Sequence, residues 1–291
     1  MVFNTIKQIG SICQTDSLGY LVNETSYEKV DNKHRELIQV FVNGLIEILG
    51  DNLNSVYVRG SVPRGQNIDK VSDLDAIIVI DKLITDRNQR LLEQLKSNLL
   101  NKNPYLVDIE MNFIEKEMLL SVKESFILTF MIKTYALCVY GENLSDKIPK
   151  FKADETIANE HIINLESQIK IAIADLQDNK GIDDIMDCCQ WIMKIMIRAG
   201  MAFVMDKEQS YTRDLYPAYT IFSKHFKEKE AEMRKTLKFA IEPVSDVSKL
   251  ISFLNTFGRW MIIQANNWLD KHNPHRLKYL LKDSSINDYG Y

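Results

Sequence analysis

Two aspartates one residue apart, Asp73 and Asp75, stand at the start of an apolar run that extends from Ala76 to Ile80. Side chains alternate between the two faces of a strand, so both carboxylates project from one face, about 6.5–7 Å apart along the backbone. Two carboxylates aimed at one point repel each other unless a cation lies between them. A hard divalent cation with oxygen ligands suits this arrangement, and Mg²⁺ is the first choice among such cations. The pair therefore predicts a metal site.

A Gly-Ser turn precedes the aspartates and follows a short apolar run, Val56–Val58. Gly60 permits a sharp turn and a close approach of the backbone to a ligand. Ser61 offers a hydroxyl, and N–H groups exposed after the turn suit a phosphate. A phosphate held beside a carboxylate-bound metal is the layout of a phosphoryl-transfer site.

Gly60-Ser61, eleven intervening residues and Asp73-Leu74-Asp75-Ala76 together resemble the signature of the DNA polymerase β-like nucleotidyltransferase superfamily. That signature combines a Gly-Ser turn, a spacer of about this length, an Asp-x-Asp with hydrophobic flanks and a third acidic residue on a later strand. Acidic pairs alone are common on solvated surfaces, whereas this combination is hard to meet by chance. The resemblance covers residues 54–113 specifically and the rest of the chain by architecture.

The third acidic residue has two candidates, Asp108 and Glu110, within the apolar segment 105–113. Both have apolar neighbours, and both lie on the same face of an extended strand. In small-molecule adenylyltransferases the third acid tends to be the first polar residue after an apolar start, so the resemblance favours Asp108. It implies that Asp108 is the general base toward an acceptor hydroxyl or a ligand of a second metal. Glu110 stays open as the alternative.

Several basic residues are candidates for binding the phosphates of a nucleotide. Arg64 lies near the Gly-Ser turn and is suited to neutralising triphosphate oxygens, unless it is a surface arginine. Residues 197–214 distantly resemble a segment of the streptomycin/spectinomycin-type adenylyltransferases, in which a helix arginine and a basic residue about fifteen positions later reach ATP phosphates. That resemblance implies phosphate contacts for Arg198 and Arg213, with Lys207 as a substitute. Charge on a helix surface is the alternative for all three.

The first part of the chain has the pattern of a small α/β sheet. Residues 1–114 are expected to form a nucleotidyltransferase domain with a mixed sheet and helices. Its expected helices and strands lie at 27–49, 55–59, 74–80, 81–100 and 105–113.

The second part of the chain is predicted to be helical, so the fold class is α/β followed by all-α. Residues 115–291 are expected to form a helical-bundle domain that closes over substrate and nucleotide, with a short apolar piece at 137–140. Its helices are expected near 154–178, 182–206, 213–227, 229–240 and 246–271.

Composition limits the classes of partner. The 291 residues include 36 basic and 40 acidic side chains, and neither half is strongly basic, which disfavours nucleic acid as the main partner. The four cysteines lack metal-ligand or disulfide-framework spacing, as expected of reduced thiols in a cytoplasmic protein. No signal peptide is indicated, and the apolar stretch 191–205 contains two basic residues, so we expect no membrane span. The oligomeric state stays open.

These observations lead to a functional hypothesis. The chain is expected to be a Mg²⁺-dependent nucleotidyltransferase that moves a nucleoside monophosphate, AMP first, from ATP or another NTP. The expected acceptor is a hydroxyl of a small molecule such as an aminoglycoside, which makes the protein an antibiotic-resistance enzyme. Two alternatives remain: a nucleotidyltransferase acting on a protein or a tRNA end, and a catalytically silent nucleotide-binding module.

Overall fold

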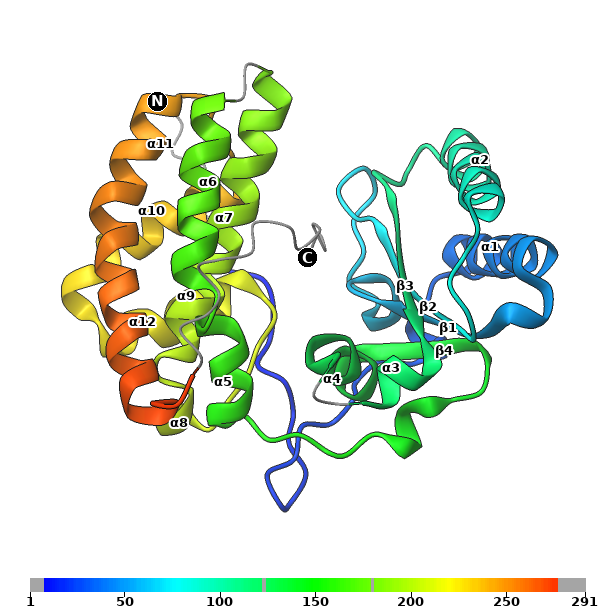
Figure 1. The fold of residues 1–291 in the computed structure, drawn as a ribbon, viewed down its shortest axis with the longest axis horizontal. Helices are drawn as coiled ribbons and strands as arrows, with labels where there is room; N and C mark the ends of the chain where they lie inside the picture. Colours follow the sequence, from blue (N-terminus) through cyan, green and yellow to red (C-terminus); the bar gives the residue numbers. More distant parts are fainter. Residues whose placement is uncertain (1–7, 122–123, 179–180, 277–291) are drawn as a thin grey trace. The chain divides into compact units, whose positions relative to one another are not determined.

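The computed structural model describes residues 8–121, 124–178 and 181–276 (Figure 1). The chain divides into two compact units. Residues 14–151 form one, which we call the sheet unit. The described residues before and after it, 8–13 and those from 152 to 276, form the other, which we call the helical unit.

The sheet has four strands, β1 (Leu53–Arg59), β2 (Leu74–Ile80), β3 (Ile109–Glu115) and β4 (Ala136–Gly141), in the order β3-β2-β1-β4. β1 runs antiparallel to both β2 and β4, whereas β2 and β3 are parallel. The sheet is therefore mixed, as the sequence predicts.

Two long helices cover one face of this sheet, α1 (Asn32–Leu49) and α2 (Asp86–Lys102). Each begins at a side chain that accepts a hydrogen bond from an otherwise unpaired N–H of the first turn. Asp31 accepts from the N–H of His34, and Thr85 accepts from the N–H of Asn88.

Alternation along β2 separates the core from the site. Leu74, Ala76 and Ile78 pack with the apolar side chains of α1 and α2 and are fully buried. Asp75 lies between them in the sequence, so its side chain projects from the opposite face. Burial of β2 on both sides fixes its register, because a slip of one residue would exchange the aspartate with the core residues.

The sheet unit continues beyond residue 114, where the sequence analysis places a domain boundary. Helices α3 (Lys116–Leu120) and α4 (Phe126–Tyr135) contact the strands, and β4 pairs with β1 as an edge strand. The structure therefore assigns residues 115–151 to the sheet unit. Residues 8–13 belong to the helical unit instead.

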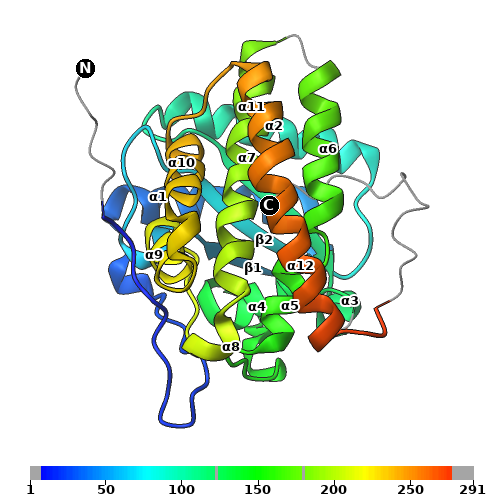
Figure 2. The ribbon, with the colours of Figure 1, turned by 90° about the vertical axis from the view of Figure 1, so that its left-hand side faces the viewer.

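The helical unit is built around α7 (Ile182–Ala202), the longest helix described. It contacts α5, α6, α9 and α10, because its apolar residues recur at helical spacing around most of its circumference. Figure 2 shows α6, α7 and α12 running alongside one another. The other helical segments of this unit are α5 (Glu155–Ile162), α6 (Leu165–Asp178), α8 (Met205–Glu208), α9 (Leu215–His225), α10 (Glu230–Ile241), α11 (Val247–Phe253), a π-helical turn (Leu254–Gly258) and α12 (Arg259–His272).

The segment that follows α8 is fixed by the start of the chain. The N–H of Cys13 donates to the carbonyl of Tyr211 at 2.8 Å, and the Thr212 hydroxyl donates to the carbonyl of Ser11 at 2.6 Å. The N–H of Ser11 donates to Asp214 Oδ2 at 2.9 Å. Within the described residues, every helix is too short or too polar to span a lipid bilayer.

Candidate active site

A row of three ionisable side chains crosses the sheet from β1 to β3. Arg59 is paired with Asp75 in the β1–β2 register, and Asp75 is paired with Glu110 in the β2–β3 register. Residues in register on neighbouring strands share a face and lie within contact distance. Asp73 lies two residues before Asp75 and joins this row from the loop that leads into β2.

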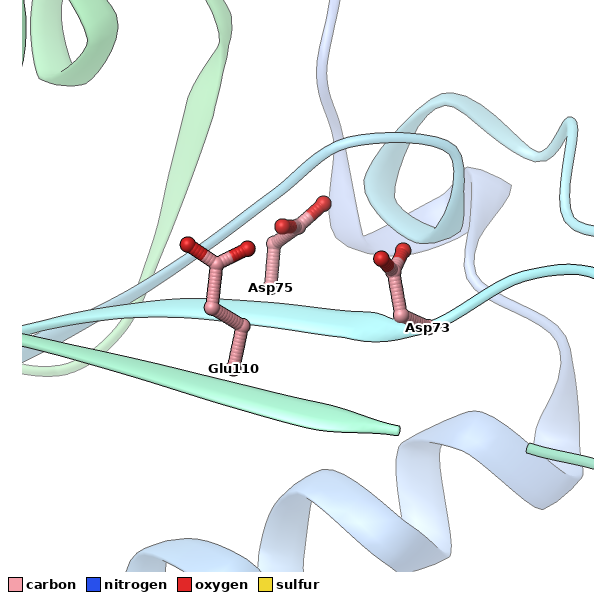
Figure 3. Close-up of side chains that lie close together, drawn as sticks. All are labelled: Asp73, Asp75 and Glu110. Carbon is pink, nitrogen blue, oxygen red and sulfur yellow. The ribbon is translucent and has the colours of Figure 1, made fainter. Parts of the chain in front are cut away.

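The carboxylates of Asp73, Asp75 and Glu110 converge (Figure 3). One oxygen from each lies within 4.8 Å of the other two. Octahedral Mg²⁺ binds oxygens at about 2.1 Å, which places neighbouring ligands about 3 Å apart. The three residues therefore fit one Mg²⁺ with a small inward movement of their side chains.

Arg59 is a member of the site that the sequence analysis missed. Its side chain is 6% exposed, and its Nη2 lies 3.0 Å from Asp75 Oδ1 and 3.1 Å from Glu110 Oε1. Its Nε is buried without a hydrogen-bond partner. Only the β1–β2 register places Arg59 beside the acids. The sequence does not show this neighbour, because the arginine and the acids are far apart in the chain.

The pKa values of Asp75 and Glu110 are shifted in opposite directions. Burial raises the pKa of Asp75 to about 7, the positive charge of Arg59 opposes this rise, and a hydrogen bond with Glu110 adds to it. Burial alone would also raise the pKa of Glu110. The hydrogen bond with Asp75 and the charge of Arg59 outweigh burial, so the pKa of Glu110 is lowered. Without a metal, the proton of the pair resides on Asp75.

Gly60 permits the close packing of the turn against Asp75. Its φ of +84° lies in the left-handed region, and a Cβ added there would lie 2.3 Å from Asp75 Oδ2. The sequence analysis expects a glycine here because a ligand must come close to the backbone. The structure shows a second reason, which is that the Asp75 carboxylate also lies against this backbone. Ser61 directly precedes a 3₁₀ turn (Val62–Arg64), and Arg64 Nε donates to the carbonyl of Gly60 at 3.1 Å.

The loop between the Gly-Ser turn and β2 is bound to the start of α1. Asn67 Nδ2 donates to Asp31 Oδ2 at 3.0 Å, and Lys33 forms an ion pair with Asp69. These contacts fix the loop whose last residue is Asp73. They explain how a polar spacer brings Asp73 to the same point as Asp75.

Asp108, the favoured third carboxylate of the sequence analysis, lies outside the cluster. β3 begins at Ile109, and Asp108 lies in the preceding turn, where its carbonyl accepts from the N–H of Leu74. The Asp108 carboxylate instead pairs with Lys96 of α2 at 2.7 Å and is 46% exposed. Glu110 takes the third place, because the β2–β3 register sets it opposite Asp75 and its carboxylate lies with those of Asp73 and Asp75.

The basic candidates of the second half all lie in the helical unit. Arg198 is half-buried on α7, Arg213 is half-buried between α8 and α9, and Lys207 is exposed on α8. The positive charges of Arg198 and Arg213 both interact electrostatically with His161 of α5. His161 stacks on Tyr211, with ring centroids 5.8 Å apart. Burial, followed by the charges of the two arginines, lowers the pKa of His161 to about 3. The structure thus brings the two arginines into one neighbourhood, and their part in nucleotide binding stays a prediction.

The mixed sheet followed by a helical unit defines the architecture of this chain. A solved structure that shares it is spectinomycin adenyltransferase AAD(9) from Enterococcus faecialis, determined with ATP and spectinomycin. The match covers 80% of this chain and 99% of that chain, at a TM-score of 0.52 and 16% sequence identity. It confirms at the level of the fold the resemblance expected from the sequence. No protein-family model and no curated protein matches this chain.

Proposed function

We propose that the protein is a Mg²⁺-dependent nucleotidyltransferase that transfers a nucleoside monophosphate, AMP first, from a nucleoside triphosphate to a hydroxyl of a small molecule. Among possible acceptors, we favour an aminoglycoside-type antibiotic. The similar structure was determined with ATP and spectinomycin, which supports this choice of nucleotide and acceptor class.

The observation on which this proposal rests is the convergence of Asp73, Asp75 and Glu110 beside the Gly60-Ser61 turn. Carboxylates gathered at one point suit Mg²⁺, and a sharp turn with a glycine and a hydroxyl suits the close approach of a phosphate. Together they supply both halves of a phosphoryl-transfer site.

In the proposed reaction the acceptor oxygen forms a bond to the α-phosphorus, the bond from that phosphorus to the bridging oxygen breaks, and pyrophosphate leaves. Bound Mg²⁺ would neutralise the charge that develops on the phosphate oxygens. Asp73 and Asp75 would hold the ion, and Ser61 and Arg64 would contact the phosphates. Glu110, whose pKa is lowered, is ionised and suited to orienting the acceptor hydroxyl and accepting its proton.

Transfer of a labelled nucleotide tests the proposal. The protein is incubated with Mg²⁺, each α-³²P-labelled triphosphate in turn, and spectinomycin, streptomycin or other aminoglycosides. We expect labelled antibiotic from ATP. Asp73→Asn and Asp75→Asn should each lose activity about a thousandfold or more, because several kcal/mol of metal stabilisation disappear.

Parallel incubations with tRNA and with cell lysate separate the alternatives. Label on tRNA or on a protein band would keep the transferase chemistry and replace the acceptor. No transfer to any acceptor, together with measurable nucleotide binding, would identify a silent binding module and reject the proposal.

A further inference from the structure

We propose that Arg59 is a fixed cation that takes the place of a second divalent ion, so that this site holds one metal ion where a two-metal site would hold two. This inference rests on the proposed function only for the identity of the site. It concerns the number of ions that the three carboxylates accept.

The geometry divides the cluster into two gaps. Asp75 lies in the middle, with Asp73 before it on the same chain segment and Glu110 beside it on β3. In two-metal sites the ions lie about 3.5–4 Å apart and share a carboxylate, so a pair of ions would occupy both gaps. Arg59 already occupies the gap between Asp75 and Glu110, with Nη2 within 3.1 Å of an oxygen of each.

The charge count agrees with this division. Once a metal ion displaces the proton of Asp75, the three ionised carboxylates carry a charge of −3, and Arg59 brings the cluster to −2. One divalent ion neutralises the remainder. Without nucleotide, a second ion would leave an excess of +2 beside Asp75, which is 8% exposed, where unpaired charge is costly.

The Arg59 side chain is also hindered from moving away from the two carboxylates. It is the last residue of β1, and its side chain is buried. Swinging it away would leave two carboxylates without their partner and would require a new partner for the guanidinium. Neither requirement applies to a metal ion that enters from solvent.

Titration with Mn²⁺ followed by electron paramagnetic resonance tests this inference without reference to catalysis. Bound Mn²⁺ is counted first without nucleotide and then with α,β-methylene-ATP, which the enzyme cannot cleave at the α-phosphorus. We expect one bound ion per chain without nucleotide and the spectrum of isolated Mn²⁺ in both conditions. Two ions about 4 Å apart would instead give a spin-coupled spectrum.

Arg59→Gln should open the second gap and raise the count from one ion to two, with a coupled spectrum. Arg59→Lys keeps a cation in the gap and should retain one ion. Arg35→Gln is the matched control, since it removes an equal charge from an arginine that contacts Tyr27, away from the acids. Circular dichroism verifies the fold of each variant.

A coupled pair of ions in the wild-type protein would overturn the inference, and so would a count of one in folded Arg59→Gln. The wild-type measurement decides by itself if Arg59→Gln fails to fold. An absence of nucleotidyl transfer would count against the proposed function and leave the ion count readable. No Mn²⁺ binding at all would reject both.

Discussion

Glu110 and Asp108 differ in their surroundings, so two similar substitutions should have effects of very different size. Glu110 faces Asp75 and Arg59, whereas Asp108 faces Lys96 and solvent. Glu110→Gln should lower kcat by about 10²–10⁴-fold, with little change in nucleotide affinity, because a group that accepts a proton acts at the chemical step. Steady-state kinetics with the labelled acceptor measures this.

Asp108→Asn is the matched control. An ion pair this exposed contributes at most about 1 kcal/mol to stability, so we expect nearly wild-type kcat and a small change in melting temperature. The reverse ranking of the two variants would show that Asp108 is the third acidic residue of the site, as the sequence analysis favours.

The Gly-Ser turn predicts a defect in metal binding at the scale of a single element. Gly60→Ala would place a Cβ 2.3 Å from Asp75 Oδ2, on a backbone with φ +84°. The carboxylate must then move out of the cluster, so we expect Mn²⁺ affinity to fall about tenfold or more, which corresponds to about 1.4 kcal/mol. Calorimetric titration measures the affinity.

Gly19→Ala isolates the effect of backbone strain. Gly19 has a φ of +79°, and a Cβ added there meets nothing within 4 Å. Both variants should lose about 1–2 kcal/mol of stability, since an L side chain is strained in the left-handed region. Only Gly60→Ala should lose metal affinity. Equal affinities in the two variants would show that the turn does not limit the position of Asp75.

His161 predicts a pH dependence of the helical unit. Its pKa is about 3 in the folded protein, below the usual value of 6.5, so the unfolded chain takes up a proton that the folded chain excludes. The contribution to stability is present above pH 6.5 and is lost as the pH falls toward 3. Between pH 6 and 5 this loss amounts to about 1.4 kcal/mol per pH unit.

Urea unfolding of the wild-type protein and of His161→Gln at several pH values checks this expectation. The variant should have the shallower slope of unfolding free energy against pH in this window, whatever its absolute stability. His275→Gln, which changes an exposed histidine, should keep the wild-type slope. Parallel slopes for all three proteins would contradict a neutral, half-buried His161.

At the scale of the whole molecule, residues 8–13 belong to the helical unit, residues 14–151 form the sheet unit, and the described residues from 152 onward complete the helical unit. The proposed role of the second unit is to bind the triphosphate through Arg198 and Arg213. Arg213→Ala should then raise KM for the nucleotide about tenfold or more, because a hydrogen bond to a charged group contributes about 1.5–3 kcal/mol. Initial rates at varied nucleotide concentration measure this.

Arg234→Ala supplies the comparison, since Arg234 is exposed and pairs with Glu230 on the neighbouring turn of α10. We expect its KM to match that of the wild type. An unchanged KM in Arg213→Ala would remove this arginine from nucleotide binding and leave the proposal for the sheet unit intact.

The sequence determined the features that depend on neighbours in the chain. The spacing of Asp73 and Asp75 predicts a shared face because strand geometry alone sets it. The position of Gly60 predicts a sharp turn, and apolar periodicity predicts α1, α2 and the helical second half. Each of these predictions uses only residues within a few positions of one another.

The tertiary structure decided the features that depend on which strands pair and in which register. The β2–β3 register sets Glu110 opposite Asp75, and the β1–β2 register sets Arg59 on its other side. The pairing of β4 with β1 moves the domain boundary to residue 151. Local sequence does not specify these contacts, because strand pairing joins distant segments whose register depends on burial of the whole sheet.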